Sequence, residues 1–432
     1  MRLWPARCAL LLGLWPMAHA ETLAEAWTLA ASVDHGLLAG RHTTAASQET
    51  LQAAQARRWP SATVQAGYTQ LNETPTAVGS LTLPPPLPPT ALNFALPLQQ
   101  PGYYAYKAEL SLPLYTGGRI EQGIEAAASM VGAARSDELR AALDLRLAVA
   151  QAYVNCLRAT RLVGVAQSGV DSLTSFSQDV DNLFEQGLVA RNDTLAARVA
   201  LAEARLRRIQ AGNGLELARA AYNRLLGREF SHALDLQEIS LEAQATDVDA
   251  LTAQAEATRP ELATVSDQGS ALRAQAASVR GGLAPQVALV GSYGHQQNRY
   301  QAHEGIATIA VGLSWALFDG GQLRHEAAAL VARADAVAAQ RDEARSLIAL
   351  QVRQAWLSTQ EAALRRVVAS AALDNADENL RLVRDRYSHG LAISTEVLQA
   401  ETLRSASQTQ GHAATYDALL AQLQLRRAIG TL

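Results

Sequence analysis

The feature that most constrains this sequence is an internal duplication. Ser111–Gln122 reads SLPLYTGGRIEQ and recurs as SWALFDGGQLRH at Ser314–His325, 203 positions later (314 − 111). Each copy runs from an apolar segment through an aromatic residue and a Gly-Gly pair into a polar, helix-like run. The same step links the run QAYV, which begins at Gln151, to QAWL, which begins at Gln354. Because a constant offset over this distance requires one unit duplicated without gaps, each copy must be a substructure of several elements.

The two copies differ by one insertion. Pro60 and Pro285 are equivalent but lie 225 positions apart (285 − 60), so the first copy carries 22 additional residues (225 − 203) before its Gly-Gly pair. The surplus falls within Pro75–Gly102 and contains the run PPPLPP at Pro84–Pro89. Consecutive prolines exclude helix and favour extended chain, so an extended loop is expected here.

Each copy predicts the same order of elements: leading helix, two strands, very long helix and return helix. Arg119–Phe184 and Gln322–Tyr387 are periodic, rich in helix formers and free of proline. At 1.5 Å per residue each would extend for roughly 100 Å. The shorter leading and return helices are expected at 22–58, 193–226, 248–281 and 395–429. The sequence therefore predicts duplicated antiparallel helical hairpins, with repeats at 21–230 and 248–432 and a connecting segment at 231–247.

Four segments between the proline and Gly-Gly positions alternate between apolar and polar residues. Strands are expected at about 61–72, 103–115, 286–297 and 306–318. Val64 and Leu110 then belong to the apolar side of their strands, and Gln65 and Glu109 to the polar side. Such a sheet could simply rest on a protein core. A membrane barrel is favoured because the strands reach the roughly ten residues that a tilted strand needs to cross a bilayer, and because aromatic residues gather near both strand ends.

The residues at the strand ends explain why the same turn occurs twice. Proline disfavours helix at the preceding residue, so Pro60 and Pro285 are expected where helix becomes strand. Glycine reaches backbone angles that other residues resist, so strand is expected to return to helix at the two Gly-Gly pairs. These four glycines are Gly117, Gly118, Gly320 and Gly321.

Four strands cannot close a barrel, and an open strand edge is not tolerated in hydrocarbon, so identical chains must combine their strands. Two copies would give eight strands, a size usually filled by its own side chains. Three copies would give twelve strands with room for a lumen. An oligomer of more than two copies is therefore expected if the protein conducts. The apolar insertion is unfavourable to leave exposed, and it is expected to cover or narrow the outer mouth.

The N-terminus and the composition bear on location and partners. Residues 1–20 predict a cleaved signal peptide, with two arginines, the short apolar run Cys8–Trp15 and small residues before Glu21. Cys8 lies inside the apolar run, so an N-terminal lipid anchor is not expected. Cys156 is then the one remaining cysteine, which excludes disulfides within the mature chain. The formal net charge of −4 offers no electrostatic footprint for nucleic acid.

Together these features resemble the TolC-like outer-membrane efflux proteins. The resemblance covers essentially the whole mature chain and rests on the duplicated plan and on motifs in a fixed order. These motifs are YTGG at 115–118, FEQGLVARND at 184–193, FDGG at 318–321 and YSHGLAISTEVLQA at 387–400. The resemblance implies a chain that is mainly α with a β-barrel portion, three copies of which close a twelve-stranded barrel in the outer membrane of a Gram-negative bacterium.

The resemblance also implies a function and partners. The long helices would form a periplasmic α-barrel, and the whole would be the passive exit channel of a tripartite efflux or type I secretion system. The implied partners are outer-membrane lipid, the other copies of a homotrimer, a periplasmic adaptor protein and an inner-membrane transporter. Adaptor docking falls at the tip turns, which contain Gly187 and Leu188 in the first copy and Gly390 and Leu391 in the second. Glycines at these positions would also serve as C-caps in any helical hairpin.

The tunnel entrance is implied at the start of the second return helix. Glu396 and Gln399 match two positions at which relatives often carry aspartates that ring the closed entrance. Because Gln399 is neutral, three copies would supply one ring of three carboxylates and a weaker cation preference. Glu396 could equally be a first-turn acid favoured by the helix dipole. Asp193 and Tyr387 match positions that lock the entrance in some relatives, but Ala392 stands where a basic partner is expected, and Tyr387 could simply pack.

No motif in the sequence indicates catalysis. It has no Gly-rich phosphate loop, no Ser-His-Asp arrangement and no clustered metal ligands, so no enzyme activity, cofactor or metal is expected. Two function classes remain: a passive export channel, and a secreted periplasmic coiled-coil scaffold or adaptor without channel activity. The amphipathic strands favour the channel, because a scaffold does not need them. Drug efflux, metal export and protein secretion fit the channel equally well, because the pump selects the cargo.

Overall fold

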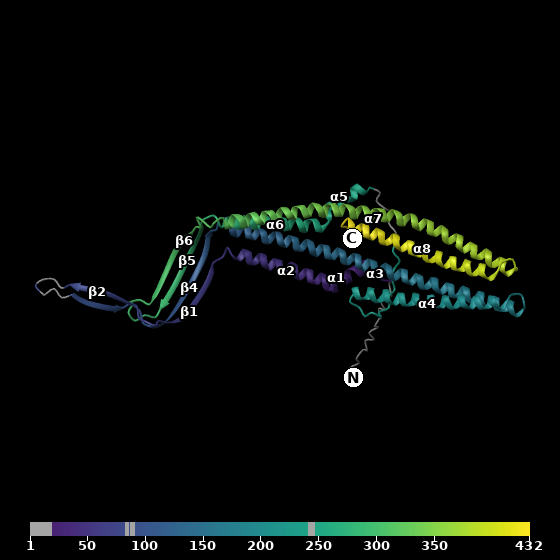
Figure 1. The fold of residues 1–432 in the computed structure, drawn as a ribbon, viewed down its shortest axis with the longest axis horizontal. Helices are drawn as coiled ribbons and strands as arrows, with labels where there is room; N and C mark the ends of the chain where they lie inside the picture. The colour runs from purple at the N-terminus through teal and green to yellow at the C-terminus, as the bar shows by residue number, and fades with distance from the viewer. Residues whose placement is uncertain (1–19, 83–85, 87–90, 241–246) are drawn as a thin grey trace, which may run out of the picture. The chain divides into compact units, whose positions relative to one another are not determined.

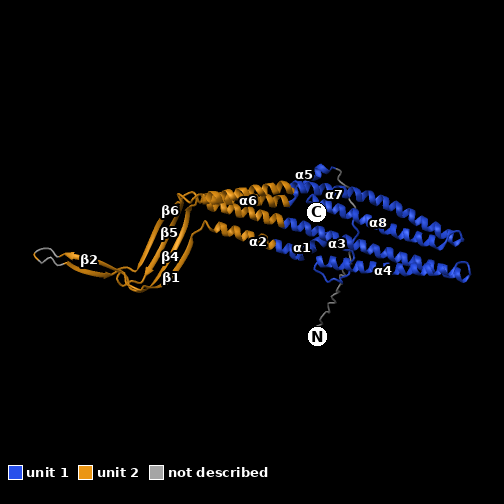
Figure 2. Ribbon diagram, in the orientation of Figure 1, with its two compact units in different colours: residues 1–40, 138–260, 345–432 blue, residues 41–137, 261–344 orange. Residues whose placement is uncertain are grey.

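A computed structural model describes residues 20–432 except 83–85, 87–90 and 241–246. The predicted signal peptide, apart from residue 20, and most of the proline-rich run therefore lie outside the described residues. The chain divides into two compact units (Figure 2). The first comprises the described parts of 1–40, 138–260 and 345–432, and the second comprises those of 41–137 and 261–344. Each unit takes segments from both repeats.

Both repeats form the same helices in the same order. Those of the first repeat are α1 (Leu23–Val33), α2 (His35–Ala56), α3 (Arg119–Glu185) and α4 (Arg191–Leu225). Those of the second repeat are α5 (Val248–Thr258), α6 (Pro260–Gly281), α7 (Gln322–Ser388) and α8 (Ser394–Ala428) (Figure 1). The long helices α3 and α7 each contain 67 residues, and the return helices α4 and α8 each contain 35. The predicted mainly α fold with duplicated helical hairpins is confirmed.

The leading helices are broken, where continuous helices were expected. α1 ends before Asp34 and α5 ends before Arg259, and both of these residues have extended backbone, with ψ of 121° and 120°. In the second repeat the break follows from Pro260, which disfavours helix at Arg259. The first repeat has no proline there. Instead, Asp34 Oδ1 accepts a 2.7 Å hydrogen bond from the Leu37 backbone N and so caps α2.

The core of the first unit lies where α1, α3, α4 and α8 meet. Tyr153 and Tyr222 are fully buried there, with ring centroids 5.8 Å apart. Burial raises the pKa of Tyr153 to about 12, so its hydroxyl stays protonated and donates to Glu21 O at 2.6 Å. The Glu21 carboxylate accepts two hydrogen bonds from Arg228, at 2.8 and 3.1 Å, and one from Tyr222 Oη at 3.2 Å. Gln237 N also donates to Glu21 O, which ties the start of the predicted mature chain to the connecting segment.

The second unit contains the sheet. Its strands pair antiparallel in the order β1 (Ser61–Gln70), β4 (Gly102–Tyr115), β5 (Gln286–Gln296) and β6 (Gly305–Ser314). They lie in the four segments that were expected to be strands, and β1 and β6 are the two edges. The expected extension of the last strand to residue 318 was wrong. The ladder ends at the Gln286–Ser314 pair, since Pro285, the next residue of the partner strand, has no N–H to donate, and Trp315 Nε1 donates instead to Leu283 O at 3.0 Å.

The sheet has an apolar face and a polar face. Residues that share the apolar face by cross-strand pairing include Val64, Leu110, Leu289, Ile309, Val311 and Leu313. Residues that share the polar face include Thr63, Gln65, Lys107, Glu109, Ser292 and Thr308. On the apolar face Val64 is 77% exposed and Ile309 is 83% exposed. In a single chain the apolar face of this sheet is therefore open.

The insertion forms a second hairpin, where a loop was expected. β2 (Thr76–Thr82) and β3 (Ala91–Pro97) pair antiparallel, and each contains 7 residues. The expectation was wrong because it assigned the loop conformation of the proline-rich run to the residues on either side of it as well. The two flanks, TAVGSLT and ALNFALP, contain no proline before Pro97, so each can enter a ladder. Pro86, the one described residue of the connection, lies in a turn.

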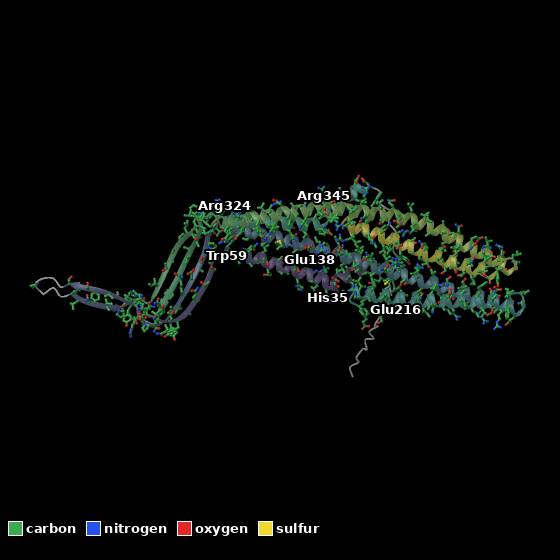
Figure 3. All side chains as sticks on the ribbon, in the orientation of Figure 1. His35, Trp59, Glu138, Glu216, Arg324 and Arg345 are labelled. Atoms are coloured by element: carbon green, nitrogen blue, oxygen red, sulfur yellow. The ribbon has the colours of Figure 1, made fainter. Side chains whose placement is uncertain are left out.

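Glycines with positive φ form the turns between strand and helix and the turns at the helical tips. Eight glycines have φ between 62° and 88°, and no other described residue has a positive φ. They form four pairs 203 positions apart: Gly117 and Gly320, Gly118 and Gly321, Gly187 and Gly390, Gly227 and Gly430. At the other end of each strand pair, Pro60 and Pro285 directly precede β1 and β5. Trp59 lies beside the first of these junctions and is 72% exposed (Figure 3).

The Gly-Gly pair after β4 allows a matched test of this geometry. Both glycines have positive φ, so an alanine at either position costs roughly 1–2 kcal/mol of backbone strain. A Cβ at Gly118 would meet open space, whereas a Cβ at Gly117 would lie 2.6 Å from Gly281 O. We expect Gly117→Ala to lower the free energy of unfolding more than Gly118→Ala does, as measured by denaturant titration of the detergent-solubilised protein. Equal losses would show that the close approach to Gly281 is unimportant.

Candidate functional site

Both helical tips are closed by the same glycine cap. Gly187 and Gly390 have a φ of 72°. In the first tip Leu188 N donates to Leu183 O at 2.9 Å, and the equivalent bond from Leu391 N is 2.8 Å. This is the pattern of a Schellman cap, which satisfies carbonyl groups at a helix end. The caps account for the two glycines and leave Leu188 and Leu391 67% and 68% exposed at the tips.

Asp193 joins the first turns of α4 and α8. It is near the start of α4, and its Oδ2 accepts a 3.3 Å hydrogen bond from Ala190 N at the helix end. Its Oδ1 accepts a 2.6 Å hydrogen bond from Ser394 Oγ, at the start of α8. Ser394 is 3% exposed, so this bond is largely shielded from water. One of the predicted entrance residues thus links the two return helices.

Tyr387 packs at the same tip without a hydrogen bond. Its ring lies 5.4 Å from that of Phe176 on α3. Its hydroxyl is buried and has no hydrogen-bond partner among the described residues. Burial raises the pKa of Tyr387, and the carboxylates of Asp193 and Asp179 raise it further. The side chain is therefore neutral and acts here as a packing aromatic.

Glu396 has a basic partner that sequence comparison did not reveal. Arg386 Nη1 lies 3.9 Å from Glu396 Oε2, and Arg386 Nη2 donates to Leu391 O at 3.0 Å. Ala392 supplies no basic group to Asp193 and Tyr387, and the charge beside Glu396 comes instead from Arg386 in the preceding helix, α7. The side chains of Arg386 and Glu396 are 56% and 42% exposed, so the pair contributes less than about 1 kcal/mol.

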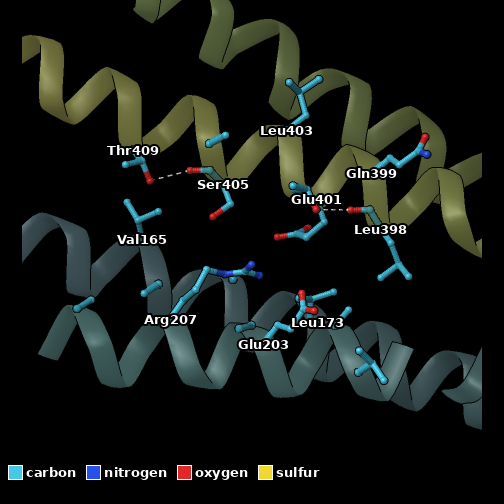
Figure 4. Close-up of a pocket in the computed structure, with 18 of the residues that line it drawn as sticks. Val165, Leu173, Glu203, Arg207, Leu398, Gln399, Glu401, Leu403, Ser405 and Thr409 are labelled. Atoms are coloured by element: carbon cyan, nitrogen blue, oxygen red, sulfur yellow. Dashed lines mark hydrogen bonds between the residues drawn. The ribbon is translucent and has the colours of Figure 1, made fainter. Parts of the chain in front are cut away.

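A cavity of about 980 Å³ lies between α3, α4 and α8 (Figure 4). Small and aliphatic side chains such as Val165 and Leu398 line most of its wall. Gln399, predicted as an entrance residue, is also part of this wall. Figure 4 shows Arg207 projecting from α4 and Glu401 from α8 into the space between the helices. The structure thus places Gln399 on an internal groove of the chain.

Glu401 is a buried carboxylate that the sequence analysis did not single out. Its side chain is 4% exposed. Ser172 Oγ on α3 donates to Glu401 Oε2 at 2.7 Å, while Arg384 on α7 and Arg404 on α8 lie 3.4 and 3.7 Å from its carboxylate oxygens. Arg404 Nε in turn donates to Asp377 Oδ1 at 2.7 Å. We call these five residues the Glu401 cluster; it joins α3, α7 and α8.

The first repeat carries one ion pair of this cluster with its charges exchanged. Asp181 and Arg198 occupy the positions of Arg384 and Glu401, 203 residues earlier (384 − 181 and 401 − 198). Arg198 Nη2 lies 3.1 Å from Asp181 Oδ1, and these side chains are 62% and 37% exposed. Each long helix is therefore bound to its return helix by an ion pair, but polarity and burial differ. Comparison of the two repeats is the signal by which the sequence could have revealed Glu401.

The remaining described side chains form neither a metal site nor a reactive thiol. The described ranges contain no group of three or more His, Cys, Asp or Glu side chains that could hold a metal ion. Burial raises the pKa of the Cys156 thiol to about 11, so this cysteine is unreactive at neutral pH. None of the helices that the structure describes is both long and apolar enough to cross a membrane.

The sequence matches a known family over most of its length. The match is to the outer membrane efflux protein family, over residues 28–228 and 251–431. These two segments correspond to the two repeats. No curated protein sequence matches the chain.

Solved structures match nearly the whole chain. The outer-membrane channel OprN is 20% identical, with a TM-score of 0.78, over 95% of this chain and 90% of its own. The outer membrane protein VceC from Vibrio cholerae is 18% identical, with a TM-score of 0.77, over 94% of this chain and 96% of its own. The CmeC outer membrane channel from Campylobacter jejuni is 15% identical, with a TM-score of 0.78, over 95% of this chain and 85% of its own. At these identities the likeness concerns the fold.

The two equivalent ion pairs provide a matched test of burial. Arg384→Met keeps an aliphatic stem but removes a charge beside the buried Glu401, so the free energy of unfolding is expected to fall by about 3 kcal/mol. Asp181→Asn, at the equivalent position, breaks a pair whose other member is mostly exposed and should cost less than about 1 kcal/mol. Denaturant titration of the two variants measures the difference. Losses of the same size would contradict a structural role for the buried carboxylate.

Proposed function

The chain belongs to the outer membrane efflux protein family, and we propose that three copies join their sheets into one twelve-stranded barrel. The protein is an exit channel of the outer membrane with a helical extension into the periplasm. The alternative, a periplasmic scaffold without channel activity, is not favoured, because a scaffold has no use for an open amphipathic sheet.

One observation supports the barrel most strongly: the apolar face of the sheet is open and both edge strands are unpaired. Ile309, Val311 and Leu313 of β6 are 83%, 66% and 67% exposed in the single chain. Lipid can cover these side chains, but it cannot satisfy the free backbone N–H and C=O groups of β1 and β6. Pairing β1 of one copy with β6 of the next satisfies both edges at once.

The number of copies follows from the need for a lumen. Two copies would give eight strands, whose interior is filled by side chains, whereas three would give twelve strands around a water-filled path. The polar face of the sheet would line this path. Lys107 and Glu109, whose charged groups lie 2.5 Å apart, would neutralise one another there. Three is thus the smallest number of copies that supplies a conducting barrel.

The helical tips are the proposed contact with partner proteins. Leu188 and Leu391 are exposed apolar residues on two caps of the same geometry. Three copies would present six such caps. We propose that a periplasmic adaptor binds the ring of caps and couples the channel to an inner-membrane transporter. The channel itself is passive, and the transporter selects the cargo and supplies the energy.

The proposed entrance is closed by contacts between the return helices and their neighbours. The Asp193–Ser394 hydrogen bond links α4 to α8, and the Glu401 cluster links α8 to α3 and α7. Opening requires the helices to separate, so these contacts must break. In three copies Glu396 would supply one ring of carboxylates at the entrance, and Gln399 would add no charge.

A pair of adjacent residues on β6 tests the barrel. Ile309→Arg places a charge on the proposed lipid face, which should cost roughly 2–4 kcal/mol and deplete the trimer from the outer-membrane fraction. Thr308→Arg places the same charge on the proposed lumen face, so it should assemble and lower the conductance to cations in planar bilayers. Gel migration without heating measures the trimer. Equal assembly of both variants would mean that the apolar face does not contact lipid.

The entrance ring is tested by exchanging charge at its two proposed positions. Glu396→Gln removes all three carboxylates from the trimer, so the preference for cations over anions, measured as a reversal potential under a salt gradient, should decrease. Gln399→Glu is the matched gain-of-charge variant, and it should increase that preference. Unchanged selectivity in Glu396→Gln would restrict Glu396 to a role as a first-turn acid of α8.

A further inference from the structure

The insertion in the first repeat forms a hairpin with one fully apolar face. β2 and β3 extend from the end of the sheet that lies opposite the helices, between β1 and β4 in the chain. Cross-strand pairing places six apolar residues on one face, which we call the hairpin face: Ala77, Gly79, Leu81, Leu92, Phe94 and Leu96. The opposite face includes Ser80 and Asn93, which are direct cross-strand neighbours. The opposite face is mixed, because Val78 and Ala95 pair beside Ser80 and Asn93, so polar side chains occur on this face alone.

The hairpin face is exposed and smooth in the single chain. Leu81, Leu92 and Leu96 are 57%, 53% and 55% exposed. The phenyl ring of Phe94 lies over Gly79, where a Cβ would be 2.6 Å from the ring Cζ. Because Gly79 has no side chain, the ring can lie across the ladder instead of projecting from it. The leucines and the ring together form a surface suited to packing.

The hairpin needs a partner to be stable. Its base is fixed, because Asn298, 1% exposed, donates from Nδ2 to Leu98 O at 2.9 Å, and Leu98 N donates to Pro75 O at 2.8 Å. Beyond this base the hairpin has two strands, and an isolated two-stranded hairpin is marginally stable in water. Covering the hairpin face with a second apolar surface supplies the missing stabilisation.

The charge of the insertion restricts what that partner is. Between Thr74 and Tyr106 the sequence has no Asp, Glu, Lys, Arg or His. Recognition of anionic lipid headgroups or sugar acids requires Lys or Arg, which form charge-assisted hydrogen bonds to phosphate and carboxylate. A strongly charged protein would likewise require opposite charges here. The composition therefore fits an uncharged, apolar partner of the same kind.

The proposed ring brings such a partner within reach. β1 is an edge strand, so the hairpin adjoins the next copy. Twelve strands spaced about 4.8 Å apart and tilted by about 40° enclose a ring of about 12 Å radius. A strand of seven residues at about 3.3 Å per residue extends for about 23 Å, nearly twice that radius. Three hairpins on one ring are long enough to meet over its centre.

We propose that the three β2–β3 hairpins of a trimer pack their hairpin faces against one another and narrow the outer mouth of the channel. The partner of each hairpin is thus a second copy of this chain. The inference rests on the proposed trimer. The leucines and Phe94 form the contact, and the opposite face, with Ser80 and Asn93, faces water.

Cross-linking of single cysteines tests the contact. Leu81→Cys lies on the hairpin face and Ser80→Cys is its immediate neighbour on the opposite face, so the two differ only in side. On mild oxidation of the detergent-extracted trimer, Leu81→Cys is expected to give several-fold more disulfide-linked dimer than Ser80→Cys. The native Cys156 is buried, and the unmodified protein measures its background. Equal linkage at both positions, or none at Leu81→Cys, would overturn the inference.

Single-channel recording tests the narrowing independently. Phe94→Asp places three carboxylates within the contact and should raise the conductance, whereas Asn93→Asp adds the same charge to the opposite face and should leave it unchanged. A conductance that is the same in both variants would overturn the inference even if trimers and pores persist. Failure of the protein to form trimers at all would instead overturn the proposed function, so the two failures are distinguishable.

Discussion

A sheet with free edges cannot remain in hydrocarbon, and the rest of this structure depends on that constraint. Each chain supplies four strands, and β1 and β6 expose backbone groups that only another copy can satisfy. The proposed oligomer therefore rests on backbone hydrogen bonding, and the proposed lumen rests on the oligomer. Each long helix follows a pair of strands in the chain, so the proposed ring of strands would also arrange the helical hairpins in a ring. α3 and α7 are equal in length, and so are α4 and α8, as the proposed trimer would require for its six hairpins to end together.

The turns that maintain this plan depend on backbone angles that only glycine reaches easily. The eight glycines with positive φ recur in four pairs, at the sheet junctions, at the tips and at the ends of the return helices. Elsewhere the two repeats reach the same geometry by different chemistry. Pro260 breaks the leading helix of the second repeat, whereas the Asp34 side chain caps the break in the first. At the start of α7 Asp319 accepts from Leu323 N, and at the start of α3 Thr116 accepts from Ile120 N.

Most of the fold could be predicted from the apolar periodicity of the sequence and from the prolines and glycines at its junctions. Long helices, return helices and alternating strands were visible because their patterns extend over many residues, and the duplication provided each prediction twice. The break at Asp34 was missed because it depends on one side-chain cap without a proline. The β2–β3 hairpin was missed because the adjacent prolines dominated the composition of the segment. At the candidate site, Gly187 and Gly390 could be placed from their motifs. Arg386 could not, because its partner lies beyond the tip turn, and Glu401 leaves no local pattern and is visible only when the two repeats are compared.

The exchanged ion pairs have a consequence for the history of the duplication. A chain built from two first repeats would carry an arginine at both return-helix positions, and Ser172 would lose the carboxylate to which it donates. A chain built from two second repeats would lose the Ser172 hydroxyl itself, because Asn375 stands at the equivalent position (375 − 172 = 203) and its longer amide has a different reach. The two copies of the duplicated unit are therefore not interchangeable at these positions. Each repeat supplies a side chain that the other lacks, so the hydrogen bond between Ser172 and Glu401 forms only in a chain that contains one copy of each.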